Sequence, residues 1–152
     1  WRAWRFSARV MPCSVPSAVV DVVLTGSMGG YQVAIASTIY LGFAALAISD
    51  TNGHVQLVVP YAGTLRNLTV GASGAQPGDG ALVFAVQVNG VTVNGTLTIA
   101  AGTSSFAFLG TDATHTDRVA AGDLISVLVT NGSPTGASIN ITSISAELVP
   151  LS

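Results

Sequence analysis

The sequence predicts an all-β domain made of two packed sheets, and three observations carry that prediction. In the stretch Ala81 to Ala100, apolar and polar residues alternate with a period of two on both sides of Asn89-Gly90. Strand-like segments follow one another between turn signals at the spacing of sandwiches and barrels. No segment has a convincing helical periodicity. About eight strands without a helix favour a Greek-key sandwich.

The first 30 residues differ in composition from the rest of the chain and predict an extended N-terminal arm. Pro12 and Pro16 oppose a long helix, and Ser17 to Leu24 can form one extended strand. A chain end is ordered only when something ties it down, and for this arm the simplest partner is a neighbouring subunit. We therefore divide the chain into an arm, residues 1–30, and a sandwich domain, residues 31–152.

Segments rich in Gly, Asn, Asp and Pro separate the strands of the sandwich domain. These residue types supply positive φ angles or tight bends. Examples are Asp50 to Gly53, Pro77 to Gly80 and Asn131 to Pro134. The predicted strands are 31–41, 43–49, 54–60, 63–71, 81–89, 91–100, 104–109, 118–130 and 137–149.

The central hairpin has two possible registers, and both keep its large apolar residues on one face. A two-residue turn pairs Val88 with Val91. That register also pairs Phe84 with Gly95. A four-residue loop instead pairs Phe84 with Ile99. The alternation excludes a slip of one residue but does not choose between these two registers.

Two later strands carry more detail. In Leu124 to Thr130 both faces are largely apolar, so we expect this strand to be covered on both sides. In Ala137 to Val149 the apolar residues change parity near Ser143, and this change of phase predicts a β-bulge.

The composition limits the classes of partner. Only 8% of the residues are charged, compared with about 25% in an ordinary soluble domain, so part of a neutral exterior is expected to lie against other copies of the chain. Three of the five basic residues, Arg2, Arg5 and Arg9, lie in the arm. The whole chain has a net charge of -2, which gives no reason to expect nucleic-acid binding by the sandwich domain. Cys13 is the single cysteine, so no disulfide forms within the chain.

The run from Met28 to Ser49 carries no charge and raises the question of a membrane helix. Its glycines and β-branched residues argue against that interpretation. Tyr31, Ile35 and Ile39 also share one parity, as in a strand. We therefore expect no membrane span.

Four motifs in the sandwich domain occur in an order that resembles a known family. They are the strand entry Pro60-x-Ala62-Gly63-Thr64-Leu65, the turn Val88-Asn89-Gly90, the pair Asp112 and His115 before a strand, and Ala121-Gly122-Asp123 before the next strand. Over roughly residues 38 to 148, the sequence resembles the small jelly-roll domains, related in shape to tumour necrosis factor, of tailed-phage structural proteins and some bacterial surface proteins.

The resemblance implies a single TNF-like jelly-roll β-sandwich that assembles as a homotrimer on the outside of a particle or at the tip of a fibre. It implies neither an enzyme nor a cofactor. Two features depart from the family pattern. Gln87 stands where a basic residue is common, and the arm has no counterpart.

On this basis we predict a viral structural protein, a bacteriophage capsid decoration protein on the virion surface. Its partners would be other copies of itself and the major capsid protein or other virion subunits. One alternative is a receptor- or glycan-binding tip of a tail fibre or surface adhesin that uses loops 71–80 and 131–137. Another is a subunit of an extracellular filament, in which Ser17 to Leu24 adds a strand to the next subunit.

The start of the arm interleaves aromatic and basic residues, a pattern that fits an acidic protein surface, lipid headgroups or nucleic acid inside a shell. We favour docking on protein, because aromatic side chains anchor in pockets and arginines pair with carboxylates. The predicted assembly contacts are Trp1, Arg2, Trp4, Arg5, Phe6 and Arg9.

The densest set of possible metal ligands is Asp112, His115 and Asp117, in an Asp-x-x-His-x-Asp segment. Without a fourth ligand, we favour the alternative that this is a polar loop whose carboxylates bind backbone N–H groups. We therefore predict no metal site and no catalytic residue. His54 and His115 are the only histidines, and no serine near them has a nucleophile-elbow pattern.

Four Asn-x-Ser/Thr sequons begin at Asn67, Asn94, Asn131 and Asn140. A chain this rich in Asn, Ser and Thr produces such sequons by chance. We favour that explanation over glycosylation.

Overall fold

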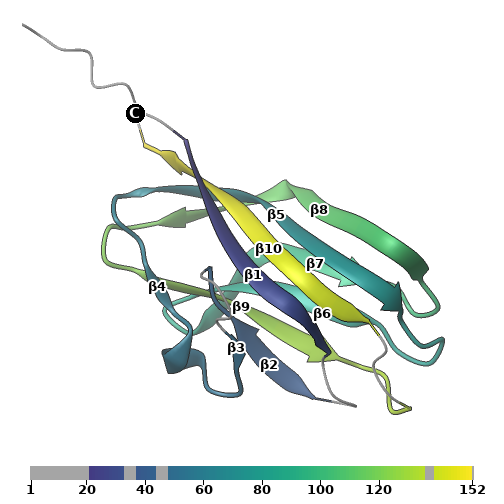
Figure 1. Ribbon diagram of the computed structural model, residues 1–152. Coiled ribbons are helices and arrows are strands. Elements are labelled where there is room, and N and C mark those ends of the chain that lie inside the picture. The colour runs from purple at the N-terminus through teal and green to yellow at the C-terminus, as the bar shows by residue number, and fades with distance from the viewer. Residues whose placement is uncertain (1–20, 33–36, 44–47, 136–138, 152) are drawn as a thin grey trace, which may run out of the picture.

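The computed structural model describes residues 21–32, 37–43, 48–135 and 139–151, which form two antiparallel sheets packed face to face (Figure 1). The four-stranded sheet has the order β1-β10-β5-β8. The six-stranded sheet has the order β3-β2-β9-β6-β7, and the short β4 also pairs with β9. The strands are β1 (Val22–Gln32), β2 (Thr38–Leu41), β3 (Ile48–Ser49), β4 (Leu57–Val58), β5 (Gly63–Ala75), β6 (Leu82–Val88), β7 (Val91–Ile99), β8 (Ser104–Val119), β9 (Leu124–Asn131) and β10 (Asn140–Pro150).

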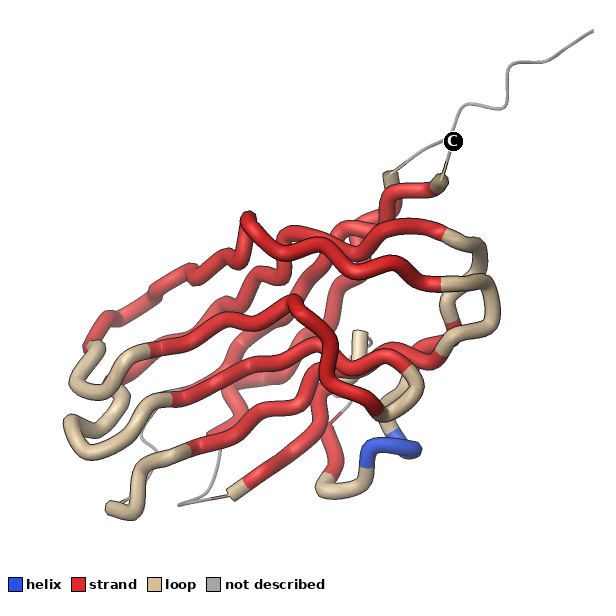
Figure 2. Tube along the Cα trace, turned by 180° about the vertical axis from the view of Figure 1, so that it is seen from behind, coloured by secondary structure: helices blue, strands red, loops and turns tan. Residues whose placement is uncertain are grey.

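The strand order is that of a jelly roll. Without the two-residue strands β3 and β4, the first, eighth, third and sixth strands form one sheet, and the second, seventh, fourth and fifth form the other. The predicted all-β sandwich is therefore confirmed. The helical segment η1 (Asn52–His54) is a single short turn, seen in blue in Figure 2. Among the described residues, no helix is long and apolar enough to cross a membrane.

The hydrophobic core lies between the two sheets and follows from the period-two alternation. On β6 the inward residues Leu82 and Phe84 are both 0% exposed. From the opposite sheet, β10 contributes Ile144 and Leu148, which are likewise buried. Because successive side chains of a strand point to opposite faces, alternate residues of each strand fill this core.

The turn of the central hairpin follows the two-residue register. Val88 pairs with Val91, and the two residues between them have the positive φ angles of a type I′ turn, 52° at Asn89 and 81° at Gly90. An Asn-Gly pair tolerates these angles better than most dipeptides, because Gly has no Cβ and Asn is enriched in the left-handed region.

Farther from the turn, neither predicted register holds. Phe84 pairs with Leu97, whereas the two registers predicted Gly95 or Ile99 as its partner. The pairing shifts between Ala85 and Gln87. The extra residues of this irregularity are on β7 around Gly95, whose backbone N–H binds a side chain of β8 instead.

The bulge predicted near Ser143 is confirmed, since the pairing of β10 with β5 shifts between Ile141 and Ser143. The two-sided cover predicted for β9 is also seen in part. Val127 and Val129 face the core and are 0% exposed, and Leu128 on the opposite face is only partly exposed.

The sandwich begins before the predicted boundary at residue 31. Val22–Gln32 forms β1 and pairs with β10, so Val22 to Gly30 belong to the sandwich and not to a separate arm. The physical reason is alternation: Gly26 and Met28 face inward and are buried, while Thr25 and Ser27 are exposed. Residues 1–20 lie outside the described part of the chain, so the arm prediction there stays a prediction.

Candidate functional site

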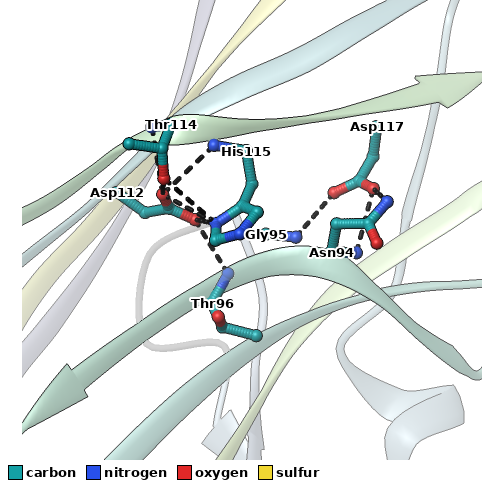
Figure 3. A network of polar contacts seen from close by, with 7 residues as sticks. All are labelled: Asn94, Gly95, Thr96, Asp112, Thr114, His115 and Asp117. Carbon is teal, nitrogen blue, oxygen red and sulfur yellow. Dashed lines mark hydrogen bonds and ion pairs between the residues drawn. The ribbon is translucent and has the colours of Figure 1, made fainter.

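Two carboxylates of β8 join the four-stranded sheet to β7 at the edge of the other sheet (Figure 3). Asp117 Oδ1 accepts hydrogen bonds from the backbone N–H of Asn94 at 2.9 Å and from its side-chain Nδ2 at 2.8 Å. Asp117 Oδ2 accepts from the N–H of Gly95 at 2.8 Å. Asp112 Oδ2 accepts from the N–H of Thr96 at 2.9 Å. We name these contacts of Asp112 and Asp117 with residues 94–96 the carboxylate clasp.

Asp112 is also held from its own strand. Its Oδ1 accepts from the Thr114 hydroxyl at 2.9 Å, and His115 Nδ1 lies 2.8 Å from its Oδ2. Burial raises the pKa of Asp112, but hydrogen bonds from His115, Thr114 and Thr96 outweigh burial and lower that pKa to about 2. Asp112 is therefore ionised at neutral pH and serves as a multiple acceptor.

The clasp depends on glycine at position 95. A Cβ added there would lie 3.1 Å from both Asp117 Oδ2 and Val86 Cγ2. Without a side chain at position 95, β7 approaches the carboxylate this closely and neither partner has to shift. The carboxylate clasp is thus one structural unit. Its partners are distant in the sequence, since 23 positions separate Asn94 from Asp117.

The cavity beside the clasp is very small. Leu65, Val86, Asp112 and His115 are among the residues that line it, and its volume is about 10 Å³. That space holds a single water molecule at most. It admits neither a sugar ring nor another organic substrate.

The predicted polar segment from Asp112 to Asp117 lies within β8 and is not a free loop. The structure brings Asp112 and His115 together, but Asp117 binds β7 instead of joining them. Among the described residues, no group of three or more His, Cys, Asp or Glu side chains is placed to hold a metal ion. The carboxylates bind backbone N–H groups, as in the non-metal interpretation. Asp112 Oδ1 accepts locally from the N–H groups of Thr114 and His115, both at 3.2 Å. Asp112 and Asp117 also accept from residues 94–96 on the other sheet.

His54 has a serine partner but no acid. Ser49 Oγ lies 3.3 Å from His54 Nδ1 on an exposed surface, and the same Oγ accepts a hydrogen bond from Thr51 N at 3.0 Å. In the described part of the chain, no carboxylate is hydrogen-bonded to His54. A Ser-His pair of this kind lacks the group that orients the imidazole in a triad.

Hydroxyl side chains form a line across the outer face of the four-stranded sheet, the sheet nearer the viewer in Figure 1. Thr25 pairs with Ser145, Ser145 with Thr69, and Thr69 with Thr111, so all four strands contribute one member. We name Thr25, Ser145, Thr69 and Thr111 the hydroxyl row. Thr69 and Thr111 are 3.1 Å apart at their hydroxyl oxygens.

A second pair of hydroxyls lies beside the row. Ser27 pairs with Ser143, and Ser143 pairs with Gly71. A Cβ at Gly71 would lie 2.5 Å from Ser143 Oγ, so this glycine makes room for the hydroxyl. The side-chain hydroxyls of four residues make no hydrogen bond to another group of the described residues, which leaves these hydroxyls to solvent or a ligand: Thr25, Ser27, Ser143 and Ser145.

Charged groups lie to one side of the hydroxyl row and bind each other. Arg66 Nε donates to Glu147 Oε2 at 2.8 Å, and Arg66 Nη2 lies 3.4 Å from Asp21 Oδ2. Asn67 Nδ2 also donates to Glu147 at 2.9 Å. The hydrogen bonds from Arg66 first, and then from Asn67, lower the pKa of Glu147. The row itself contains no charge.

The two loops predicted to bind a ligand, 71–80 and 131–137, are joined to each other by side-chain hydrogen bonds. Ser133 Oγ donates to Asp79 Oδ1 at 2.7 Å, and Thr135 also donates to Asp79. Gln76 Nε2 donates to Asn131 Oδ1 at 3.2 Å. Residues 71–75 belong to β5, so the first loop is shorter than predicted. Residues 136–138 lie outside the described part.

The predicted assembly contacts also lie outside the described residues, as does Cys13. The hydroxyl row and the carboxylate clasp were both missed by the sequence interpretation. For the row, a signal was available, since Thr and Ser recur at outward positions of several strands. For the clasp there was no local signal, because its partners are on different sheets.

No protein-family model and no curated protein matches this sequence. Among solved structures, the chain is similar to a carbohydrate-binding module CBM36 in complex with calcium and xylotriose, at 15% identity and a TM-score of 0.44, over 84% of this chain and 99% of that one. It is similar to the module CBM6cm-2 of Cellvibrio mixtus lichenase 5A in complex with cellotriose, at 17% identity and a TM-score of 0.41, over 84% of this chain and 95% of that one. A third similarity is to a ruminal GH26 endo-β-1,4-mannanase, at 14% identity and a TM-score of 0.41, over 78% of this chain and 19% of the mannanase chain.

Proposed function

We propose that this chain is a non-catalytic binding module that recognises neutral glycans on the outer face of its four-stranded sheet. The observation that carries the proposal is the hydroxyl row. Its four members come from four adjacent strands, and Thr25 and Thr111 at its two ends are exposed. Ser and Thr hydroxyls both donate and accept hydrogen bonds, as the hydroxyl groups of a sugar do.

The charges of the sheet favour a neutral ligand. The row and the neighbouring Ser27 and Ser143 are uncharged, while Arg66 is bound to Glu147 and Asp21. A phosphate-rich polymer would find no free cation in the row, and a cationic ligand would find no carboxylate. Neighbouring strands lie about 4.8 Å apart, so a row over four strands is about 14 Å long. This length matches a short oligosaccharide lying flat on the sheet.

The carboxylates support a binding role and not a catalytic one. Asp112 and Asp117 accept backbone hydrogen bonds, and their cavity is too small for a substrate. A glycan-binding role corresponds to the adhesin or fibre-tip alternative of the sequence interpretation and carries with it an extracellular location. The capsid-decoration and homotrimer predictions came from the family resemblance and stay predictions.

The test is affinity electrophoresis through gels that contain neutral β-linked polymers of glucose, xylose or mannose. The variant Thr69→Val/Thr111→Val removes two hydroxyls of the row while keeping branched side chains. Each lost hydrogen bond is worth about 1 kcal/mol, so we expect affinity to fall about tenfold or more.

The matched control is Thr98→Val/Thr130→Val. These two threonines are exposed and both pair with Val83 on the other sheet, so the same chemical change is made on the opposite side of the molecule. We expect this variant to bind like the wild type. Absence of binding to every neutral polymer, or equal loss in both variants, contradicts the proposal.

A further inference from the structure

We propose that two copies of the chain join edge to edge along β1, about a two-fold axis that passes through Thr25. The two four-stranded sheets would then form one continuous sheet. The pairing is inferred from the geometry and chemistry of this edge, and only its consequence for ligand binding rests on the proposed function.

The two edges of the four-stranded sheet, β8 and β1, differ in how they are covered. At β8, the carboxylates of Asp112 and Asp117 bind the backbone of β7 and close that side of the sandwich. At β1, pairing within the described residues is with β10 alone. One side of β1 therefore presents backbone N–H and C=O groups that a further strand can bind.

The β1 edge lacks the usual protection against pairing with a strand of another molecule. Natural edge strands carry lysine, proline, inward charges or bulges. The segment Val22 to Ser27 contains no charge and no proline, and its pairing with β10 is regular. The irregularity of β1 begins only after Ser27, where Gly29 and Gly30 have φ angles of 62° and 80°. Val23 is 60% exposed on this unprotected segment.

The side-chain alternation of β1 determines the register in which two copies of this strand can pair. In a continuous sheet, residues directly opposite each other point to the same face, so a two-fold axis must pass through a residue and not between two residues. An axis at Thr25 places Leu24 opposite Gly26 of the second copy, where no side chain competes for space. It also places Val23 opposite Ser27 of the second copy, which covers part of its exposed apolar surface.

Charge does not oppose the pairing of two β1 strands. In this register Asp21 lies opposite Gly29 of the second copy, so the two Asp21 carboxylates do not meet. Each Asp21 keeps its contact with Arg66 of its own copy. A neutral edge thus faces a neutral edge without repulsion. This self-complementarity leads us to assign the edge to a second copy of the chain.

The consequence concerns the hydroxyl row. Thr25 is the end member of the row at β1, so the axis places Thr25 beside Thr25 of the second copy. The two rows then join in line, from Thr111 of one copy to Thr111 of the other. If the proposed function holds, the dimer offers one glycan chain a site of twice the length.

The first experiment is disulfide trapping of the full chain. Thr25→Cys is made together with Cys13→Ser, so that each chain has one thiol. Directly opposed residues of antiparallel strands have Cα atoms about 4.5–5.5 Å apart, within the range of a disulfide. We expect a covalent dimer on mild oxidation. The control, Thr111→Cys with Cys13→Ser, places the thiol at the clasped edge, away from the proposed interface, and is expected to form no covalent dimer.

The second experiment measures molar mass by light scattering, without any ligand. Thr25→Lys places two ammonium groups opposite each other and is expected to give a monomer, while Thr111→Lys is expected to remain a dimer. Circular dichroism confirms that both variants fold. A monomeric wild type overturns the proposal, and so does equal cross-linking at positions 25 and 111. A trimer that is insensitive to Thr25→Lys also overturns it. A dimer without glycan binding would instead contradict the proposed function alone.

Discussion

The two edges of the four-stranded sheet solve the same physical problem in different ways. An edge strand leaves a row of backbone donors and acceptors without a ladder partner. At β8, Asp112 and Asp117 bind the N–H groups of residues 94–96 on the opposite sheet, so side chains close the sandwich. At β1 no such side chain is present between Val22 and Ser27. The comparison teaches that one edge is built for the monomer, while the other is suited to a partner.

Asp117→Ala should have the largest effect, because it breaks the clasped edge. Gly95 is buried, and its N–H and that of Asn94 would lose their acceptor. An unsatisfied buried donor costs about 1–3 kcal/mol, so we expect the free energy of unfolding to fall by about 3 kcal/mol in urea titrations. Asp50→Ala is the control, since Asp50 is exposed and, within the described residues, its side chain accepts from Thr51 alone. Similar losses of unfolding free energy in both variants would show that the carboxylate clasp adds nothing to the stability of the fold.

Acid should weaken the clasped edge through Asp112. Its pKa is about 2 in the folded state and 3.8 ordinarily, so the folded state binds this proton less readily than the unfolded state. The stabilisation, about 2 kcal/mol, is complete above about pH 3.8 and is lost as the pH falls to about 2. Thermal unfolding of wild type and Asp112→Asn across this range checks the prediction. The difference in stability between them should shrink with acid, and a constant difference would contradict it.

Gly95→Ala tests the close approach that the clasp requires. The new Cβ would lie 3.1 Å from Asp117 Oδ2 and from Val86 Cγ2, so β7 must move away by a few tenths of an ångström. We expect a loss of about 1–2 kcal/mol in guanidinium unfolding. Gly53→Ala is the matched control, because nothing lies within 4 Å of a Cβ at that position. If Gly95→Ala proved as stable as the wild type, the close approach of β7 to Asp117 would not require glycine at position 95.

Val23→Lys should have the smallest effect on the fold and sharpens the comparison from the open edge. The side chain is 60% exposed, so we expect the stability of the monomer to change by less than about 0.5 kcal/mol. Measurements in dilute solution, where the monomer dominates, check this value. A large loss there would show that β1 already has a partner within its own chain.

The sequence interpretation succeeded where the pattern was local. The alternation over β6 and β7 predicted a hairpin, without choosing between its two possible turns, and the change of parity near Ser143 predicted a bulge; the hairpin and the bulge are both present. It failed where a partner lies far along the chain. The register beyond Phe84 and the fate of Asp117 both depend on the contact between β7 and β8. The boundary at residue 31 was placed by a change in composition, whereas β1 begins at Val22 and Gly29-Gly30 lie at an irregularity within it.

The candidate site was less predictable than the fold. The sequence placed Asp112, His115 and Asp117 close together, but it did not show that Asp117 points to another strand. Asn131 was interpreted as part of a turn, and Asn94 as part of a strand and a sequon, yet Asn94 binds Asp117 and Asn131 binds Gln76. The side chain of an asparagine reaches across strands as readily as it caps a turn. Which of these it does depends on its neighbours in space.

By itself, the sequence determined that the chain is all-β, which face of each strand is buried and where the turns lie. These features follow from the two-residue period of a strand and from the φ angles that Gly and Asn allow, so neighbouring residues are enough to specify them. Only the tertiary structure decided that Asp112 and Asp117 close one edge, that four hydroxyls align across four strands and that β1 pairs on one side only within the described residues. These features depend on strand order and register, which are set when distant segments pack around a common core.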